Sequence, residues 1–170
     1  GLAAFSSALA LPNPFSPRAA STLRPVDQHI RFMAEVLPGK PISMHGCVLS
    51  HSETDAVLYQ ALLHGDGRPA AVFRTRVAHI DTNEFEAFPW PRRTREKLVA
   101  LTAPQPADTA PRSIDPDAPG LAVTDITYDR IRACQIPMIG KGAVPIQHLD
   151  AHGWMASPWF IGRVSDSVPN

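Results

Sequence analysis

The sequence predicts an α+β fold in which a long antiparallel β-meander wraps around a central α-helix. Four apolar segments of strand length follow one another between residues 26 and 80, and short turns separate them. This arrangement favours antiparallel pairing between neighbouring strands. Apolar residues at helical spacing occur towards both ends of the chain. Sheet and helix can therefore bury their apolar faces against each other.

Composition and charge limit the class of protein. The 170 residues are 44% hydrophobic and 19% charged, which is typical of a globular protein and unlike a disordered chain. Lys and Arg together number 16, as do Asp and Glu, so we expect no nucleic-acid partner. The sequence has no apolar run long enough to span a membrane. Cys47 and Cys134 are far apart and predict free thiols, and these features together favour a cytoplasmic protein.

The first hundred residues predict one helix, four strands and a short second helix. Leu2, Phe5 and Leu9 have helical spacing, and three prolines that follow end this helix. Turns rich in Gly, Pro and Asp separate the strands and indicate a meander. The predicted strands are residues 26–36, 42–49, 56–63 and 70–80, and the second helix is 92–101.

The last predicted strand indicates which face of the sheet meets the core. Phe73 and Val77 alternate with Arg74 and Arg76. The face that carries the arginines is therefore expected to be exposed to solvent in the middle of the strand, and the apolar face must be buried against another element. His79 lies among apolar neighbours in the same strand. A hydrogen-bonded structural role is favoured for it over a catalytic role.

The composition changes after residue 103. A segment rich in Pro, Asp and Ala predicts an extended, poorly packed linker. Beyond it, residues 139–149 indicate an edge strand interrupted by Gly and Pro. Ser157 and Pro158 suit the start of a helix that runs towards residue 168. The predicted divisions are residues 1–103, 104–122 and 123–170.

The polar turn between this strand and this helix, His148–Met155, holds the residues best suited to catalysis. A carboxylate at a helix entrance can activate water, while unpaired backbone N–H groups there can stabilise an oxyanion. Gly153 would let a substrate approach the backbone closely. An Asp in such a turn also commonly hydrogen-bonds its own backbone, so both roles stay open for Asp150. A metal site formed by Asp150 with His148 and His152 is a minority hypothesis.

Asp150, Gly153 and Met155 form a D-x-x-G-x-M motif between the predicted strand and helix. Together with the long strands that begin at VDQHIRFMAEV (residues 26–36), this motif resembles hot-dog-fold acyl-CoA thioesterases. Many members of that family carry D-x-x-G-H-M, and Trp154 stands here where the His is expected. The segment FIGRVSD (residues 160–166) is similar to the helix of double hot-dog members.

The resemblance implies hydrolysis of acyl-CoA or acyl-carrier thioesters, with coenzyme A as part of the substrate and with no further cofactor or metal. Asp150 would be the base or nucleophile with His152 beside it, and the backbone at Gly153 and Trp154 would hold the oxyanion. The residues implied to contact the substrate are His148, Met155, Trp159 and Arg163, with Lys141 as a further candidate for the phosphates. Trp154 and Trp159 suit either an acyl pocket or an ordinary core, and the core is favoured.

Two other functions stay open. Trp154 in place of His favours a non-catalytic acyl-binding or dimerisation module, whereas Asp150 near a His suits an enoyl hydratase or dehydratase. The order of the parts also differs from that of a hot-dog unit, because the strands precede the motif and its helix. The chain is therefore either a fragment of a double hot-dog protein or a permuted unit. We expect its two pieces to pack together, or the chain to form a homodimer.

Overall fold

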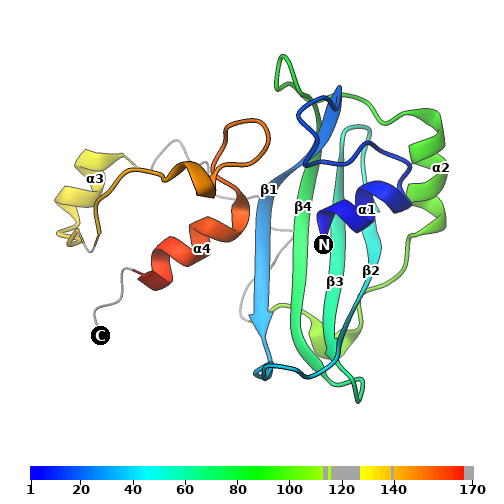
Figure 1. The fold of residues 1–170 in the computed structure, drawn as a ribbon, viewed down its shortest axis with the longest axis horizontal. Helices are drawn as coiled ribbons and strands as arrows, with labels where there is room; N and C mark the ends of the chain where they lie inside the picture. Colours follow the sequence, from blue (N-terminus) through cyan, green and yellow to red (C-terminus); the bar gives the residue numbers. More distant parts are fainter. Residues whose placement is uncertain (113–114, 116–126, 139, 167–170) are drawn as a thin grey trace. The chain divides into compact units, whose positions relative to one another are not determined.

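The computed structural model describes residues 1–112, 115, 127–138 and 140–166, with side chains in the last range up to Gly162. The chain divides into two compact units, residues 1–114 and 115–170. Each helix and strand predicted in the first hundred residues is present in unit 1 (Figure 1). Unit 1 contains α1 (Leu2–Ala8), β1 (Ser21–Phe32), β2 (Ile42–His51), β3 (Asp55–His64), β4 (Pro69–Asp81), α2 (Arg92–Ala100) and the 3-10 helix η1 (Ala107–Thr109).

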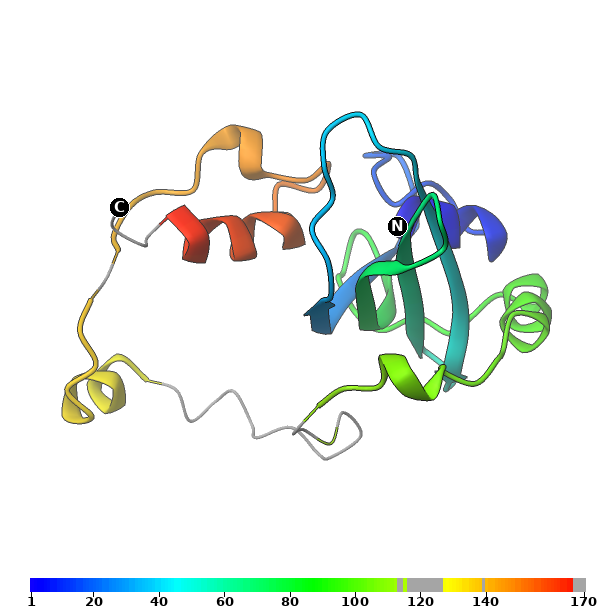
Figure 2. The ribbon, with the colours of Figure 1, turned by 90° about the horizontal axis from the view of Figure 1, so that it is seen from below.

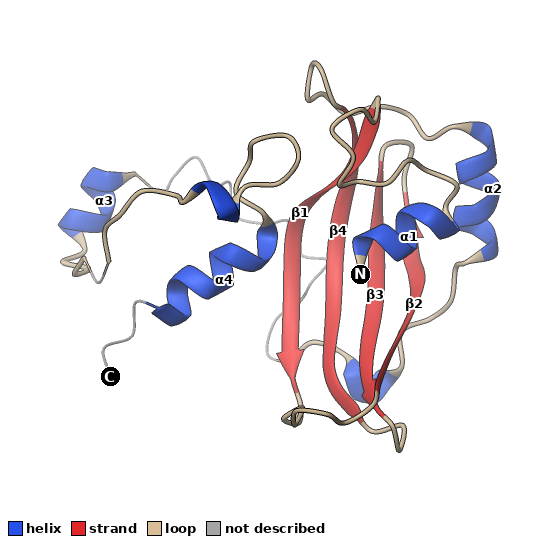
Figure 3. Cartoon of the chain, viewed as in Figure 1, coloured by secondary structure: helices blue, strands red, loops and turns tan. Residues whose placement is uncertain are grey.

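The strands of unit 1 form one antiparallel sheet in the order β1-β4-β3-β2 (Figure 3). The fold class is the predicted α+β, and β2, β3 and β4 form the predicted meander. The prediction was wrong for β1, which pairs with β4 instead of β2. The expected turn does form, since Lys40 N–H donates to the Leu37 carbonyl at 3.3 Å. The Ala70 carbonyl accepts from the N–H groups of Met33 and Ala34, which fixes the end of β1 beside β4.

The main core of unit 1 lies on the face of the sheet that α1 covers (Figure 1). Phe5 and Leu9, two residues of the predicted helical pattern, pack there against apolar residues of all four strands. The buried members of this core are Phe5, Leu9, Leu23, Val48, Ala56, Leu58, Val77, Trp90 and Leu98. Further along the strands on the same face, Phe32, Ile42 and Met44 are exposed, because α1 is too short to reach them.

The beginning of the predicted linker packs onto the opposite face of the sheet (Figure 2). Arg31 Nη1 donates to the carbonyls of Asp108 at 2.9 Å and Ala110 at 3.2 Å, and Thr109 is buried. Residues 104–110 are therefore part of unit 1 and are held at these contacts, although most of them are exposed. Their exposed carbonyls are acceptors that the guanidinium of Arg31 can satisfy. The remainder of the predicted linker lies largely outside the described residues.

Unit 2 contains α3 (Tyr128–Ala133), the 3-10 helix η3 (Ile146–His148) and α4 (Ser157–Asp166). The predicted helix start at Ser157 is confirmed. The predicted strand is absent from residues 140–149, which form coil and η3. Pro145 lacks an N–H donor and breaks the regular ladder that a strand needs. Residue 139, the first of that prediction, lies outside the described residues.

Two further features of the described residues bear on the sequence predictions. Both Cys47 and Cys134 are free, as predicted. None of the helices in the described residues has the length and apolar character required to cross a bilayer.

Candidate functional site

The predicted catalytic turn lies in unit 2 between η3 and α4. The Asp150 N–H donates to the Trp154 carbonyl at 2.7 Å, and the Gly153 N–H donates to the Asp150 carbonyl at 3.1 Å. Gly153 has a φ of +81°, a backbone conformation that favours glycine. Leu149 and Met155 form an antiparallel bridge across the base of the loop. The turn is thus a small, internally bonded loop that brings most of the predicted catalytic residues together.

The Asp150 carboxylate is part of the bonding that holds this loop. Its Oδ1 accepts from the backbone N–H groups of His152 at 2.8 Å and Trp154 at 3.0 Å. The predicted oxyanion site at Gly153 and Trp154 therefore needs correction. Both N–H groups already donate to Asp150, one to its carbonyl and one to its side chain. A substrate oxyanion would have to displace these bonds to use either donor.

The two histidines of the motif are half-buried and have unsatisfied ring nitrogens. Nδ1 of His148 and Nε2 of His152 are buried without a hydrogen-bond partner among the described residues. The ring of His148 stacks on Trp159, with centroids 3.9 Å apart and planes 8° from parallel. Neither imidazole hydrogen-bonds to Asp150 in the part of the chain that the structure describes. The Asp–His pair expected for a hydratase is therefore not formed.

The other predicted contact residues lie mostly at exposed or half-buried positions. Trp154 and Trp159 are exposed, so the prediction that they belong to a core was wrong. Met155 is half-buried, and Lys141 is exposed in the loop before η3. Arg163 lies in α4, and its side chain is outside the described residues. Within the described residues, no three His, Cys, Asp or Glu side chains are grouped closely enough to hold a metal ion.

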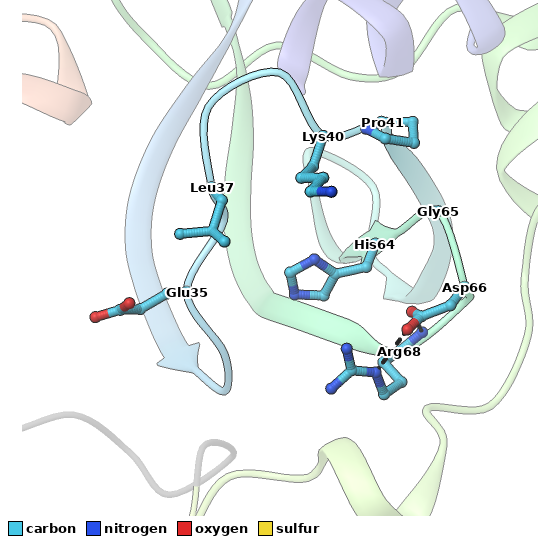
Figure 4. A pocket seen from close by; sticks show the side chains of 8 residues that line it. All are labelled: Glu35, Leu37, Lys40, Pro41, His64, Gly65, Asp66 and Arg68. Carbon is cyan, nitrogen blue, oxygen red and sulfur yellow. Dashed lines mark hydrogen bonds and ion pairs between the residues drawn. The ribbon is translucent and has the colours of Figure 1, made fainter.

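A second group of polar residues occurs in unit 1, and sequence reasoning did not identify it as a site. Residues of the β1–β2 connection and of the β3–β4 hairpin line a cavity of about 420 Å³ (Figure 4). The side chains in this lining that can donate hydrogen bonds from a cationic or titratable group are Lys40, His64 and Arg68. Each occurs in a sequence typical of an ordinary turn. Only the strand order shows that the two turns lie at the same end of the sheet.

The family of the chain follows from a match to a family model. The model of the thioesterase-like superfamily matches residues 6–98, which include the end of α1, the whole sheet and most of α2. The chain belongs to the thioesterase-like superfamily. The matched region is confined to unit 1, so the Asp150 turn lies beyond it. No curated protein sequence matches this superfamily member.

Several solved structures are similar to this chain at low sequence identity. DHNA-CoA thioesterase from Staphylococcus aureus is 14% identical, with a TM-score of 0.50 and coverage of 58% of this chain and 70% of that protein. The PA5185 protein of Pseudomonas aeruginosa is 19% identical, with a TM-score of 0.48 and coverage of 51% of this chain. A predicted thioesterase from Bacillus stearothermophilus is 14% identical, with a TM-score of 0.47 and coverage of 54% of this chain and 71% of that protein. The chain described here covers only 62% of the length of the Pseudomonas protein.

Proposed function

We propose that this protein hydrolyses acyl-CoA or acyl-carrier thioesters. The observation that carries the proposal is the match of residues 6–98 to the thioesterase-like superfamily. Structures similar to this fold include proteins described as thioesterases and a Staphylococcus aureus protein in complex with CoA. CoA would be part of the substrate, and a homodimer in the cytoplasm is the proposed working form.

In the proposed reaction, the Asp150 carboxylate activates water through Oδ2. The bonds from His152 and Trp154 hold Oδ1, so the carboxylate has a fixed orientation. The water oxygen attacks the thioester carbonyl carbon while the carboxylate takes its proton. The tetrahedral intermediate collapses, the C–S bond breaks, and the leaving thiolate takes the proton that the carboxylate received from water. Nε2 of His152, which has no hydrogen-bond partner among the described residues, is the proposed donor to the oxyanion in place of the occupied N–H groups of the turn.

A non-catalytic acyl-binding module is the second candidate. It is favoured by the hydrogen bonds within the turn, because Asp150 already has a structural task there. Under this alternative the carboxylate only orders the loop before α4. The chain would then bind acyl-CoA without releasing its thiol.

Thiol release from short, medium and long acyl-CoAs, compared among Asp150 variants, tests the proposal. Asp150→Asn keeps an Oδ1 acceptor for the turn but lacks a carboxylate base, whereas Asp150→Ala lacks both. If Asp150 is the base, both variants lose at least about 100-fold in kcat/KM. Asp129→Asn, at an exposed position in the same unit, is the matched control and keeps full activity.

Three other results would count against catalysis by Asp150. Full activity of Asp150→Asn together with loss in Asp150→Ala would assign only a turn-ordering role. Equal activity in all variants would place the reaction elsewhere. Saturable acyl-CoA binding without thiol release by the wild-type chain would favour the binding module. The reaction of Cys47 and Cys134 with the thiol reagent is subtracted by using protein without substrate.

A further inference from the structure

The cavity in unit 1 brings together two segments that are far apart in sequence. β1 ends and β2 begins at the same end of the sheet as the β3–β4 hairpin, because the strands are antiparallel in the order β1-β4-β3-β2. The cavity between them has a volume of about 420 Å³. Its lining residues are Glu35, Leu37, Lys40, Pro41, His64, Gly65, Asp66 and Arg68 (Figure 4).

The walls of this cavity are fixed by the backbone. In the hairpin, the His64 N–H donates to the Arg68 carbonyl at 2.9 Å, and the Gly67 N–H donates to the His64 carbonyl at 2.9 Å. Gly65 touches the other wall so closely that a Cβ there would lie 2.7 Å from Cγ of Pro41. The hairpin and the connection are therefore in direct contact at this point.

Two basic and two acidic side chains line the cavity, and one acid is paired with one base. Arg68 Nε pairs with Asp66 Oδ2 at 2.8 Å, and the Arg68 N–H donates to Oδ1 at 3.1 Å. This side-chain hydrogen bond holds the pKa of Asp66 below its usual value, so the acid is ionised and neutralised by Arg68. Figure 4 shows the Glu35 carboxylate pointing away from His64, whereas the Lys40 ammonium points towards it. Lys40 forms no ion pair with any described residue.

His64 supplies a polar atom that lacks a partner. Its Nε2 is buried and has no hydrogen bond within the described residues. An unsatisfied buried polar atom destabilises the protein, so a ligand that hydrogen-bonds to it gains affinity. Figure 4 shows the ring directed into the cavity between Lys40 and Arg68. Arg68 pairs with Asp66 through Nε, so its terminal amino groups can also donate hydrogen bonds to a ligand.

We propose that this cavity binds the phosphomonoester group of a larger ligand through Lys40, His64 and Arg68. Donors from three side chains suit an oxyanion with several oxygens better than the two oxygens of a carboxylate. The volume exceeds the space that a phosphate ion fills, and Leu37 and Pro41 offer apolar contact to the group that carries it. CoA has such a phosphomonoester on its ribose. The identification of CoA as the ligand rests on the proposed function, whereas the phosphate site does not.

Titration of the full chain with inorganic phosphate, CoA and dephospho-CoA, which lacks that phosphomonoester, tests this site. The His64 imidazole resonances are followed by NMR, and dissociation constants are measured for the wild type, Lys40→Met and Lys97→Met. Lys97 is exposed in α2 and not among the residues lining the cavity, so its variant is the matched control for removal of one positive charge. Thiol release is measured separately on the same samples.

We expect phosphate to shift the His64 resonances saturably, and CoA to do so more strongly than dephospho-CoA. Lys40→Met should weaken this binding at least about tenfold, as expected for loss of one charge-assisted hydrogen bond, and Lys97→Met should leave it unchanged. Phosphate binding without a CoA effect would support the site and assign it to a different phosphomonoester. The proposal is overturned if the His64 resonances respond to none of the ligands, or if Lys40→Met and Lys97→Met have equal effects. Neither outcome depends on whether the protein releases thiol.

Discussion

Buried polar side chains of unit 1 show how single residues organise the fold. His79 is fully buried in β4, and both of its ring nitrogens are paired. Nδ1 lies 2.8 Å from the Phe88 carbonyl, which can only accept, so Nδ1 carries the proton. Nε2 then accepts from the Ser21 hydroxyl at 2.9 Å. The ring also stacks on Trp90, with centroids 4.7 Å apart. The predicted structural role of His79 is thus confirmed.

The neutral state of His79 predicts how stability depends on pH. Burial lowers its pKa from the ordinary value of 6.5, so the unfolded chain binds a proton more readily than the folded chain does. The free energy of unfolding should therefore be highest above pH 6.5 and fall as the pH drops towards the lower pKa of the folded state. Urea unfolding followed by circular dichroism between pH 5 and 8 measures this effect (about three pH values suffice).

His79→Gln separates this effect from other titrations. It should cost about 1–3 kcal/mol above pH 6.5, because buried partners lose a hydrogen bond, and it should flatten the pH dependence. His51→Gln changes an exposed histidine and should leave the curve as in the wild type. An unchanged slope in His79→Gln would show that another group is responsible. Asp66 and Asp81 cannot cause a pH dependence between pH 5 and 8, because hydrogen bonds lower their pKa values below the ordinary value of an aspartate.

At the scale of elements, the contact between α1 and the sheet depends on a missing side chain. A Cβ on Gly46 of β2 would lie 2.8 Å from Cζ of Phe5 and 2.8 Å from the Tyr59 carbonyl oxygen. Phe5 can therefore approach the sheet this closely only because position 46 is glycine. The same short helix leaves Phe32 and Met44 exposed further along that face. Length of the helix thus decides how much of the sheet is covered.

Gly46→Ala should destabilise unit 1 by about 1–3 kcal/mol, since the added methyl group overpacks the contact with Phe5. Denaturant unfolding gives the difference in free energy. In a double-mutant cycle with Phe5→Leu, the two costs should sum to more than the cost of the double variant. Gly142→Ala is the control, because a Cβ there meets nothing within 4 Å. Equal stability of Gly46→Ala and the wild type would show that α1 is not held as described.

At the scale of the whole molecule, each apolar core of the described residues lies within unit 1. The core under α1 extends from Phe5 to Leu98, and the smaller cluster on the other face is formed around Tyr59, Ala61 and Val72. The family match also falls within this unit. Unit 2 has short helices, and its apolar residues Trp154, Phe160 and Ile161 are exposed. Stability of the fold is therefore expected to reside mainly in residues 1–114.

A chain of residues 1–114 should consequently fold alone. Its circular dichroism should show one cooperative urea transition, with a free energy of unfolding within about 1 kcal/mol of that of the full chain. The full chain, measured at the same molar concentration, is the control. Loss of the transition, or a much lower midpoint, would support the prediction from sequence that the two pieces pack together.

Local patterns in the sequence determined most elements of this protein. The spacing of Leu2, Phe5 and Leu9 predicted α1, alternation predicted the strands, and Ser157 with Pro158 predicted the start of α4. The D-x-x-G-x-M motif indicated the family, which the match to residues 6–98 confirmed. The reason is physical: helical spacing, strand alternation and turn chemistry act over a few residues, so they can be recognised without a partner.

Only the tertiary structure decided which distant segments meet. It paired β1 with β4, placed residues 104–110 on the sheet through Arg31, and replaced the predicted strand before Asp150 by coil and η3. It also brought Lys40 to the cavity of His64 and Arg68. Each of these outcomes depends on contacts between residues far apart in the chain. The free energies of such contacts cannot be read from a local sequence pattern.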